Sequence, residues 1–93
     1  MKELRKTNRD FKRNLNGGVQ IAYRFDNGYG ASVVRHSFSY GNENGLWELA
    51  VIRWKEDDFH LCYDTKITND VLGRLTPEEV NATLTRIEKL EVV

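Results

Sequence analysis

The chain has 93 residues and a mass of 10.8 kDa, which leaves room for a single hydrophobic core. Hydrophobic residues make up 40% and charged residues 30%, values that exclude disorder along the whole chain. No apolar run is long enough to span a bilayer, and a single cysteine, Cys62, excludes an internal disulfide. We therefore expect a cytoplasmic protein without a membrane partner.

The net charge of zero conceals an asymmetry along the chain. Residues 1–14 carry a net charge of +4 and the remainder carries −4. Such a basic arm either folds back onto its own acidic body or reaches out to phosphate or to an acidic partner. The basic residues of the arm are Lys2, Arg5, Lys6, Arg9, Lys12 and Arg13.

The first segment, Lys2 to Leu15, is mostly polar. Its three apolar residues, Leu4, Phe11 and Leu15, have spacings that put them on one face of a helix. The stripe is thin, so either a short helix or a frayed arm is expected. We divide the chain into a basic arm, residues 1–16, and a single domain, residues 17–93.

Beyond Gly18 the hydrophobic period becomes two, which predicts strands. The first is Val19–Phe25, and Asn27-Gly28 is the strongest short signal for a two-residue hairpin turn. With that turn, Ile21 lies opposite Val34 on a second strand that runs over residues 29–40.

Two more strands follow the loop at residues 41–45. The third is Leu46–Trp54, and a charged turn at residues 55–58 leads to a fourth. Pairing Trp54 with Phe59 places Ile52 beside Leu61, so that all three hairpins share one apolar face. A slip of one residue in the third strand would instead place Trp47, Leu49 and Val51 on that face.

A helix closes the sequence. Thr76-Pro77-Glu78-Glu79 supplies an N-cap, a proline at the first position and a capping box. One stripe follows at helical spacing: Val80, Leu84, Ile87 and Leu90. The predicted fold is α+β: a four-stranded antiparallel β-meander with the C-terminal α-helix packed on one face.

Strand alternation then predicts an apolar patch on the face away from the helix. Aliphatic residues and a tryptophan bordered by arginines are typical of a protein-binding surface. Three explanations for this patch remain open: the N-terminal segment covers it, a second copy covers it in a homodimer, or a foreign protein or ligand binds there. The predicted partner-binding residues are Val33, Arg35, Trp47, Leu49, Val51 and Arg53.

Residues that could support catalysis are few. No glycine-rich loop lies between a strand and a helix, and His36 is expected on the core face. His60 and Cys62 share a strand face but lack a third group to orient them, and Cys62 is expected to be a small buried hydrophobe. We predict no enzyme, no metal and no cofactor.

Nucleic-acid binding is the alternative to protein binding. Trp47 and Tyr29 on a sheet, with arginines and the basic arm nearby, would offer stacking and phosphate contacts. The acidic body and the pI of about 6.7 argue against it.

Several segments resemble a family of small proteins encoded by bacteriophages and prophages. The resemblance covers roughly residues 19–90 and leaves out the basic arm. It is carried by Phe25–Val34, Ser39–Gly41, Gly45–Val51, Tyr63–Thr65, Ile67-Thr68 and Leu75–Val80. It implies a phage accessory protein in the bacterial cytoplasm and assigns no functional residue. We therefore expect a non-enzymatic interaction protein that acts on an unidentified host protein, for example as an inhibitor of a host or defence protein.

Overall fold

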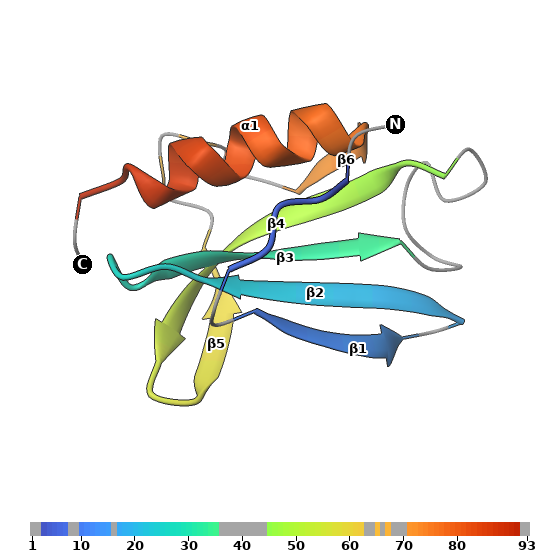
Figure 1. The fold of residues 1–93 in the computed structure, drawn as a ribbon. Helices are drawn as coiled ribbons and strands as arrows, with labels where there is room; N and C mark the ends of the chain where they lie inside the picture. Colours follow the sequence, from blue (N-terminus) through green and yellow to red (C-terminus); the bar gives the residue numbers. More distant parts are fainter. Residues whose placement is uncertain are drawn as a thin grey trace.

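A computed structural model describes residues 3–7, 10–15, 17–35, 45–62, 65, 67 and 71–91. Within these residues the fold is one antiparallel sheet with one helix across a face (Figure 1). The elements are β1 (Phe11–Leu15), β2 (Gly18–Arg24), β3 (Tyr29–Arg35), β4 (Trp47–Lys55), β5 (Asp58–Leu61), β6 (Leu72–Leu75) and α1 (Pro77–Glu88).

The strands follow the order β1-β2-β3-β4-β5, and β6 also pairs with β4. β6 lies along the first half of β4, and β5 lies along its second half. The predicted pairing of Trp54 with Phe59 and of Ile52 with Leu61 is confirmed. The α+β class and the C-terminal helix are also confirmed, whereas the expected count of four strands omits β1 and β6.

The start of α1 follows directly from its sequence. Thr76 is the N-cap, its hydroxyl accepts a hydrogen bond from the backbone N–H of Glu79, and the Glu79 carboxylate accepts one from the backbone N–H of Thr76. These hydrogen bonds lower the pKa of Glu79, because they favour the charged carboxylate. The helix then buries Val80, Leu84 and Ile87 against the sheet.

The hairpin between β2 and β3 differs from the prediction by one residue. Phe25 pairs with Tyr29 around a three-residue loop, and Gly28 has a φ of 88°. This is the arrangement of a turn followed by a glycine bulge, instead of a two-residue turn. Ile21 therefore lies opposite Val33 and not Val34.

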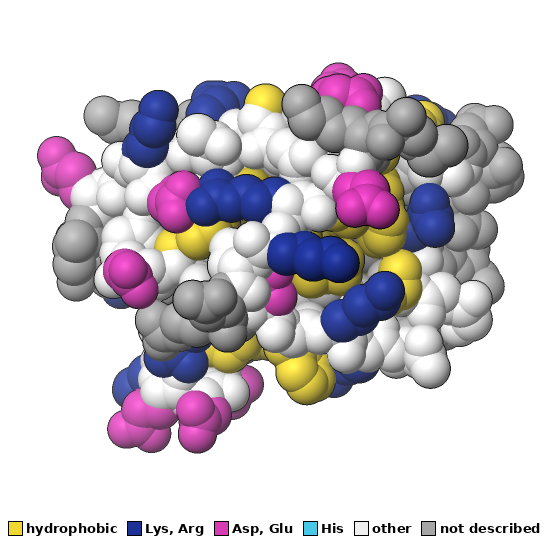
Figure 2. Space-filling view, in the orientation of Figure 1, with side chains coloured by type: hydrophobic (Ala, Val, Ile, Leu, Met, Phe, Trp, Pro, Cys, Tyr) yellow, Lys and Arg dark blue, Asp and Glu magenta, His cyan; other side chains and the backbone are white. Residues whose placement is uncertain are grey.

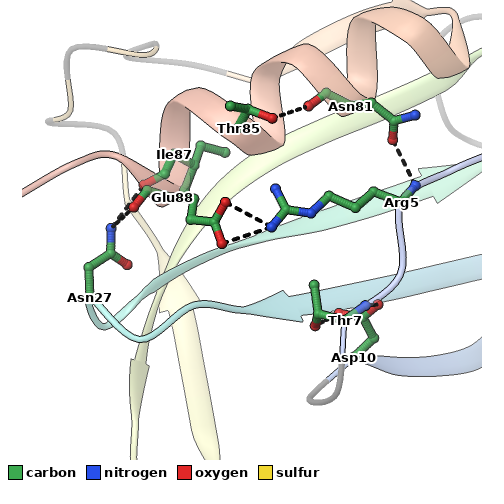
Figure 3. A network of polar contacts seen from close by, with 8 residues as sticks. All are labelled: Arg5, Thr7, Asp10, Asn27, Asn81, Thr85, Ile87 and Glu88. Atoms are coloured by element: carbon green, nitrogen blue, oxygen red, sulfur yellow. Dashed lines mark hydrogen bonds and ion pairs between the residues drawn. The ribbon is translucent and has the colours of Figure 1, made fainter.

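The Asn27 side chain holds this loop both locally, where its oxygen accepts from the Tyr29 N–H, and at the end of α1, 60 residues away. The side-chain amide of Asn27 donates to the carbonyls of Ile87 and Glu88 at the end of α1 (Figure 3). It also donates to the carbonyl of Leu90. Carbonyls at a helix C-terminus lack partners within the helix, so the Asn27 amide satisfies them and connects the loop to α1.

A shift of one residue exchanges the two faces of every following strand. The core under α1 therefore contains the residues predicted to be exposed. Val33, Leu49 and Val51 are completely buried, and Trp47 is 7% exposed. The predicted apolar docking face is wrong, because these side chains form the hydrophobic core. The second predicted strand extends to residue 40, and residues 36–40 lie outside the described residues.

The N-terminal segment also differs from the predicted helix or frayed arm. Residues 11–15 form β1, which pairs with β2 from Phe11 opposite Ala22 to Leu15 opposite Gly18. Gly17 has a φ of 80° in the turn between them. The basic segment is thus partly a strand of the same sheet.

The face of the sheet away from α1 has small residues at its centre. Gly30 has no room for a Cβ, because the carbonyl of Tyr23 and the indole of Trp54 occupy that space. The Trp54 indole donates to this carbonyl at 2.8 Å and lies against Arg24 and Phe59. Two large apolar side chains are exposed here, Phe11 at 51% and Leu61 at 49%.

Candidate functional site: a pocket beneath the N-terminal segment

The helix covers only part of its face of the sheet. α1 packs mainly against β3, β4 and β6. The side of the face formed by β1 and β2 is crossed instead by the extended N-terminal segment, residues 3–7, which descends from the level of α1 to β1 (Figure 1). A pocket remains between this segment and the sheet.

Polar contacts attach the N-terminal segment to the helix. The Asn81 amide accepts a hydrogen bond from the backbone N–H of Arg5 at 2.7 Å and donates to the carbonyl of Glu3 at 2.9 Å. The Arg5 guanidinium donates to both carboxylate oxygens of Glu88 (Figure 3). Leu4 packs against the edge of the core. The segment is therefore held at three points along its length.

A fourth contact comes from the sheet below. The buried hydroxyl of Tyr23 donates to the carbonyl of Arg5 at 2.7 Å. Burial, and to a smaller extent the nearby Asp10 carboxylate, raise the pKa of Tyr23 to about 12. The phenol is consequently neutral at physiological pH and remains a hydrogen-bond donor.

The chain turns toward β1 immediately after this segment. The Asp10 carboxylate accepts hydrogen bonds from the backbone N–H and the hydroxyl of Thr7. This local pairing places Asp10 at the mouth of the pocket and already uses both of its oxygens.

The pocket has a volume of about 520 Å³, within the range of small-ligand sites. Its lining is mostly apolar. It consists of Glu3, Leu4, Arg5, Lys6, Thr7, Asp10, Lys12, Val19, Ile21, Tyr23, Arg35, Trp47 and Pro77. The lining comes from the N-terminal segment, from β1 to β4 and from the first turn of α1, so no single stretch of sequence encodes it.

Cationic side chains border this apolar lining. The Arg35 guanidinium lies 4.5 Å from the ring centroid of Trp47 and donates to the carbonyl of Gly45. Lys6 and Lys12 are exposed, and neither has an ion-pair partner among the described residues. Figure 2 shows Lys and Arg side chains lying over hydrophobic ones on this face of the molecule.

The net charge of the rim favours an anion. Arg5 is neutralised by Glu88, which leaves three cations, Lys6, Lys12 and Arg35, beside the carboxylates of Glu3 and Asp10. The rim therefore carries one more positive than negative charge. An apolar group that carries a negative charge matches this arrangement.

The six predicted partner-binding residues are separated in the structure. Val33, Leu49 and Val51 lie in the core and line no surface. Trp47 and Arg35 line the pocket together, in a different place from the one predicted. Arg53 lies on β4 between Tyr29 and His60, and it is not part of the pocket lining.

Of the six predicted nucleic-acid-binding residues, the four that the structure describes, Arg5, Lys6, Lys12 and Arg13, do not form one continuous stripe. Lys2 and Arg9 lie outside the described residues. Arg5 is paired with Glu88, and the Arg13 guanidinium donates to Gln20. Since Lys12 and Arg13 are neighbours on a strand, they point to opposite faces of the sheet.

The two residues considered for catalysis, His60 and Cys62, differ in their exposure to solvent. Cys62 is buried in the core as expected, whereas His60 is exposed beside a second cavity of about 320 Å³ at the β4–β5 hairpin. Within the described part of the chain, no three His, Cys, Asp or Glu residues are grouped to hold a metal ion. His36 lies outside that part. None of the described helices has the length and apolarity needed to cross a membrane.

Sequence reasoning missed the residues that assemble the pocket, above all Asn81 and β1. A signal for β1 was present, because Asn16-Gly17 is the same hairpin dipeptide that marks the turn after β2. No comparable signal marks Asn81, since an exposed helix asparagine has no pattern that reveals its partner.

Comparisons with known proteins give no relatives for this site. The chain matches no known family model, no curated protein and no solved structure. Function is therefore inferred from the residues and their geometry.

Proposed function

We propose that the protein is a non-enzymatic binding protein that takes an anionic, partly apolar group of a partner into the pocket beneath its N-terminal segment. One observation carries this proposal: a mostly apolar cavity of about 520 Å³ has Lys6, Lys12 and Arg35 at its rim. Apolar lining supplies affinity, and a few placed charges supply orientation.

The composition of the lining favours binding over catalysis. The polar groups at the pocket are two lysines, two arginines, two carboxylates, the Thr7 hydroxyl and a neutral tyrosine that already donates to a carbonyl. The Thr7 hydroxyl does donate to the Asp10 carboxylate, but the two residues are bonded within the turn that leads to β1, and the pocket lining contains no histidine or cysteine. The groups instead fit the recognition of an acid by charge and by apolar contact.

The resemblance to phage-encoded proteins suggests where the partner is found. A small protein of this kind would act in the bacterial cytoplasm by occupying an acidic site on a host or defence protein, for example as an inhibitor. The docking face expected from strand alternation forms the core, so the pocket replaces it as the proposed contact.

The dye 1-anilinonaphthalene-8-sulfonate tests the proposal because it joins an apolar ring system to one negative charge. We expect the folded protein to bind the dye at one site, with an affinity that decreases as salt is added. The double variant Lys6→Glu/Lys12→Glu should bind about tenfold more weakly, because two attractive charges become repulsive. Lys55→Glu, at the distant β4–β5 hairpin, is the matched control and should bind like the wild type.

Two results would contradict the proposal. One is dye binding that is insensitive to the reversal of Lys6 and Lys12 while unfolding curves show intact folding. The other is binding to a duplex or single-stranded oligonucleotide that decreases steeply with salt and is lost in the same double variant while the dye still binds. The second result would favour the nucleic-acid alternative.

A further inference from the structure

The pocket opens beside a free edge of the sheet. β1 is the last strand in the order, and β2 is the only described strand that pairs with it. Lys12 of β1 is itself part of the pocket lining. An edge strand presents unpaired N–H and C=O groups that can pair with another extended chain.

We infer that the partner contributes an acidic, extended segment that adds to the sheet along β1 and places an apolar side chain in the pocket. This inference rests on the proposed function and names the form of its ligand. Main-chain pairing on β1 would supply affinity, and the pocket with its lysines would supply specificity.

The exposed side chains of β1 define the chemistry of that segment. Alternation places Lys12 on the pocket face, and Phe11 and Arg13 on the opposite face. A bound strand also alternates, so an acidic side chain opposite Lys12 lies next to Lys6 on the same side. On the other side, a carboxylate matches Arg13 and an apolar residue matches the half-exposed ring of Phe11.

A second copy of the chain is a poorer occupant of the same edge. Antiparallel pairing of two β1 strands centred on Arg13 places the two Arg13 residues opposite each other. A register centred on Lys12 does the same with the two Lys12 residues. Like charges directly opposite each other destabilise a strand pair, so charge complementarity favours a foreign acidic segment.

A peptide selection tests the inference and requires no identified partner. A library of random 12-residue peptides is first depleted on the Lys6→Glu/Lys12→Glu variant and then selected on the immobilised full-length wild type. We expect enriched peptides with two neighbouring acidic residues, one facing Lys12 and one facing Arg13, and with apolar residues beside them. Their binding, measured by fluorescence anisotropy, should weaken in Lys12→Glu and stay unchanged in the matched control Lys55→Glu.

Methylation of the peptide backbone then tests strand pairing directly. Two versions of the best peptide carry N-methyl groups on one or the other alternate set of backbone nitrogens. We expect one version to lose about tenfold or more in affinity and the other to lose much less, because alternate N–H groups of an added strand face β1 and solvent. Amide hydrogen exchange in β1 should slow when the unmethylated peptide binds.

The outcomes separate this inference from the proposed function. If both methylated peptides bind like the parent and β1 exchange does not change, strand addition is wrong while the pocket remains the binding site. The proposed function fails as well if no peptide is enriched on the wild type after the depletion step. It also fails if the selected peptides bind the Lys6→Glu/Lys12→Glu variant with the same affinity as the wild type. Enriched peptides with basic residues would overturn both.

Discussion

One face of the sheet has two different coverings. Beneath α1 the contacts are apolar and closed, and Val33, Leu49 and Leu84 have no exposed surface. The N-terminal segment is held mostly by polar contacts to Asn81 and Glu88 of α1, and a cavity remains between the segment and the sheet. The same strands therefore contribute to a packed core in one half and to an open pocket in the other.

The difference follows from how each covering is attached. A helix with a continuous apolar stripe excludes water along its whole length, whereas an extended segment contributes one partly buried leucine and is held by hydrogen bonds. Stability should therefore depend on the helix side, and ligand binding on the segment side. Four predictions test this division, beginning with the one that should change stability most.

Truncation of one leucine on each side gives the strongest contrast. Leu84→Ala should lower the free energy of unfolding by about 2–5 kcal/mol, because it leaves a cavity in a packed core. Leu4→Ala should cost about 1 kcal/mol, because Leu4 is only partly buried and borders an existing pocket. Urea unfolding measures both values. Equal losses would show that the two coverings do not differ in stability.

The stability of the protein at alkaline pH tests the raised pKa of Tyr23, whose hydroxyl connects the sheet to the N-terminal segment. The pKa of Tyr23 is raised to about 12 in the folded protein, against an ordinary value of 10.0. Between these values the unfolded chain loses the proton first, so stability decreases as pH rises through that window, by about 2–3 kcal/mol.

Tyr23→Phe should remove this component of the alkaline decline. At neutral pH the variant should cost about 1 kcal/mol, because one hydrogen bond to Arg5 is lost. Denaturant unfolding on both proteins, from neutral pH to beyond the raised pKa, measures the difference. Parallel pH profiles for the two proteins would contradict the raised pKa.

Removal of the Asn81 amide should loosen the N-terminal segment selectively. Asn81→Ala deletes the side-chain bonds to both Glu3 and Arg5 and should cost about 1–2 kcal/mol. Amide exchange should accelerate over residues 3–7 and stay unchanged under α1. Asn81→Asp is a matched variant, because it still accepts from Arg5 but cannot donate to Glu3. Faster exchange throughout the sheet would mean that the segment is part of the cooperative core.

The Arg5–Glu88 ion pair should have the smallest effect. Both side chains are partly exposed, so a double-mutant cycle with Arg5→Gln and Glu88→Gln should give a coupling of about 0.2–1 kcal/mol. The coupling should disappear in about 1 M salt, where exposed charges are screened. A coupling that persists in high salt would indicate a pair shielded from solvent.

Local patterns predicted much of the fold. The capping box at Thr76 and the charged hairpin between Trp54 and Phe59 depend on residues that are close in sequence, and both predictions are confirmed. The strand β1 could also have been predicted from the sequence, because Asn16-Gly17 is a hairpin signal. It was missed because its polar residues show no clear alternation.

The two-residue turn at Asn27-Gly28 could not have been corrected from its own sequence. In the three-residue loop the Asn27 side chain accepts a hydrogen bond from the Tyr29 N–H, and its amide donates to carbonyls of α1, a contact across 60 residues that no local pattern reveals. The length of the loop sets the face of every later strand, and it moved Trp47 from the predicted docking surface into the core. The candidate site depended on long-range contacts of the same kind, so the sequence indicated only its cations and Trp47, and not their position.

Intermolecular nuclear Overhauser effects from the bound naphthalene sulfonate would show directly whether the pocket is the binding site. We expect contacts from the dye rings to the Leu4 methyl groups and to the Trp47 indole, which both line the pocket. Shift changes should be centred on Lys6 and Lys12. Contacts confined to Phe59 and His60 at the β4–β5 hairpin, or to Phe11 and Leu61 on the opposite face, would contradict the proposed site.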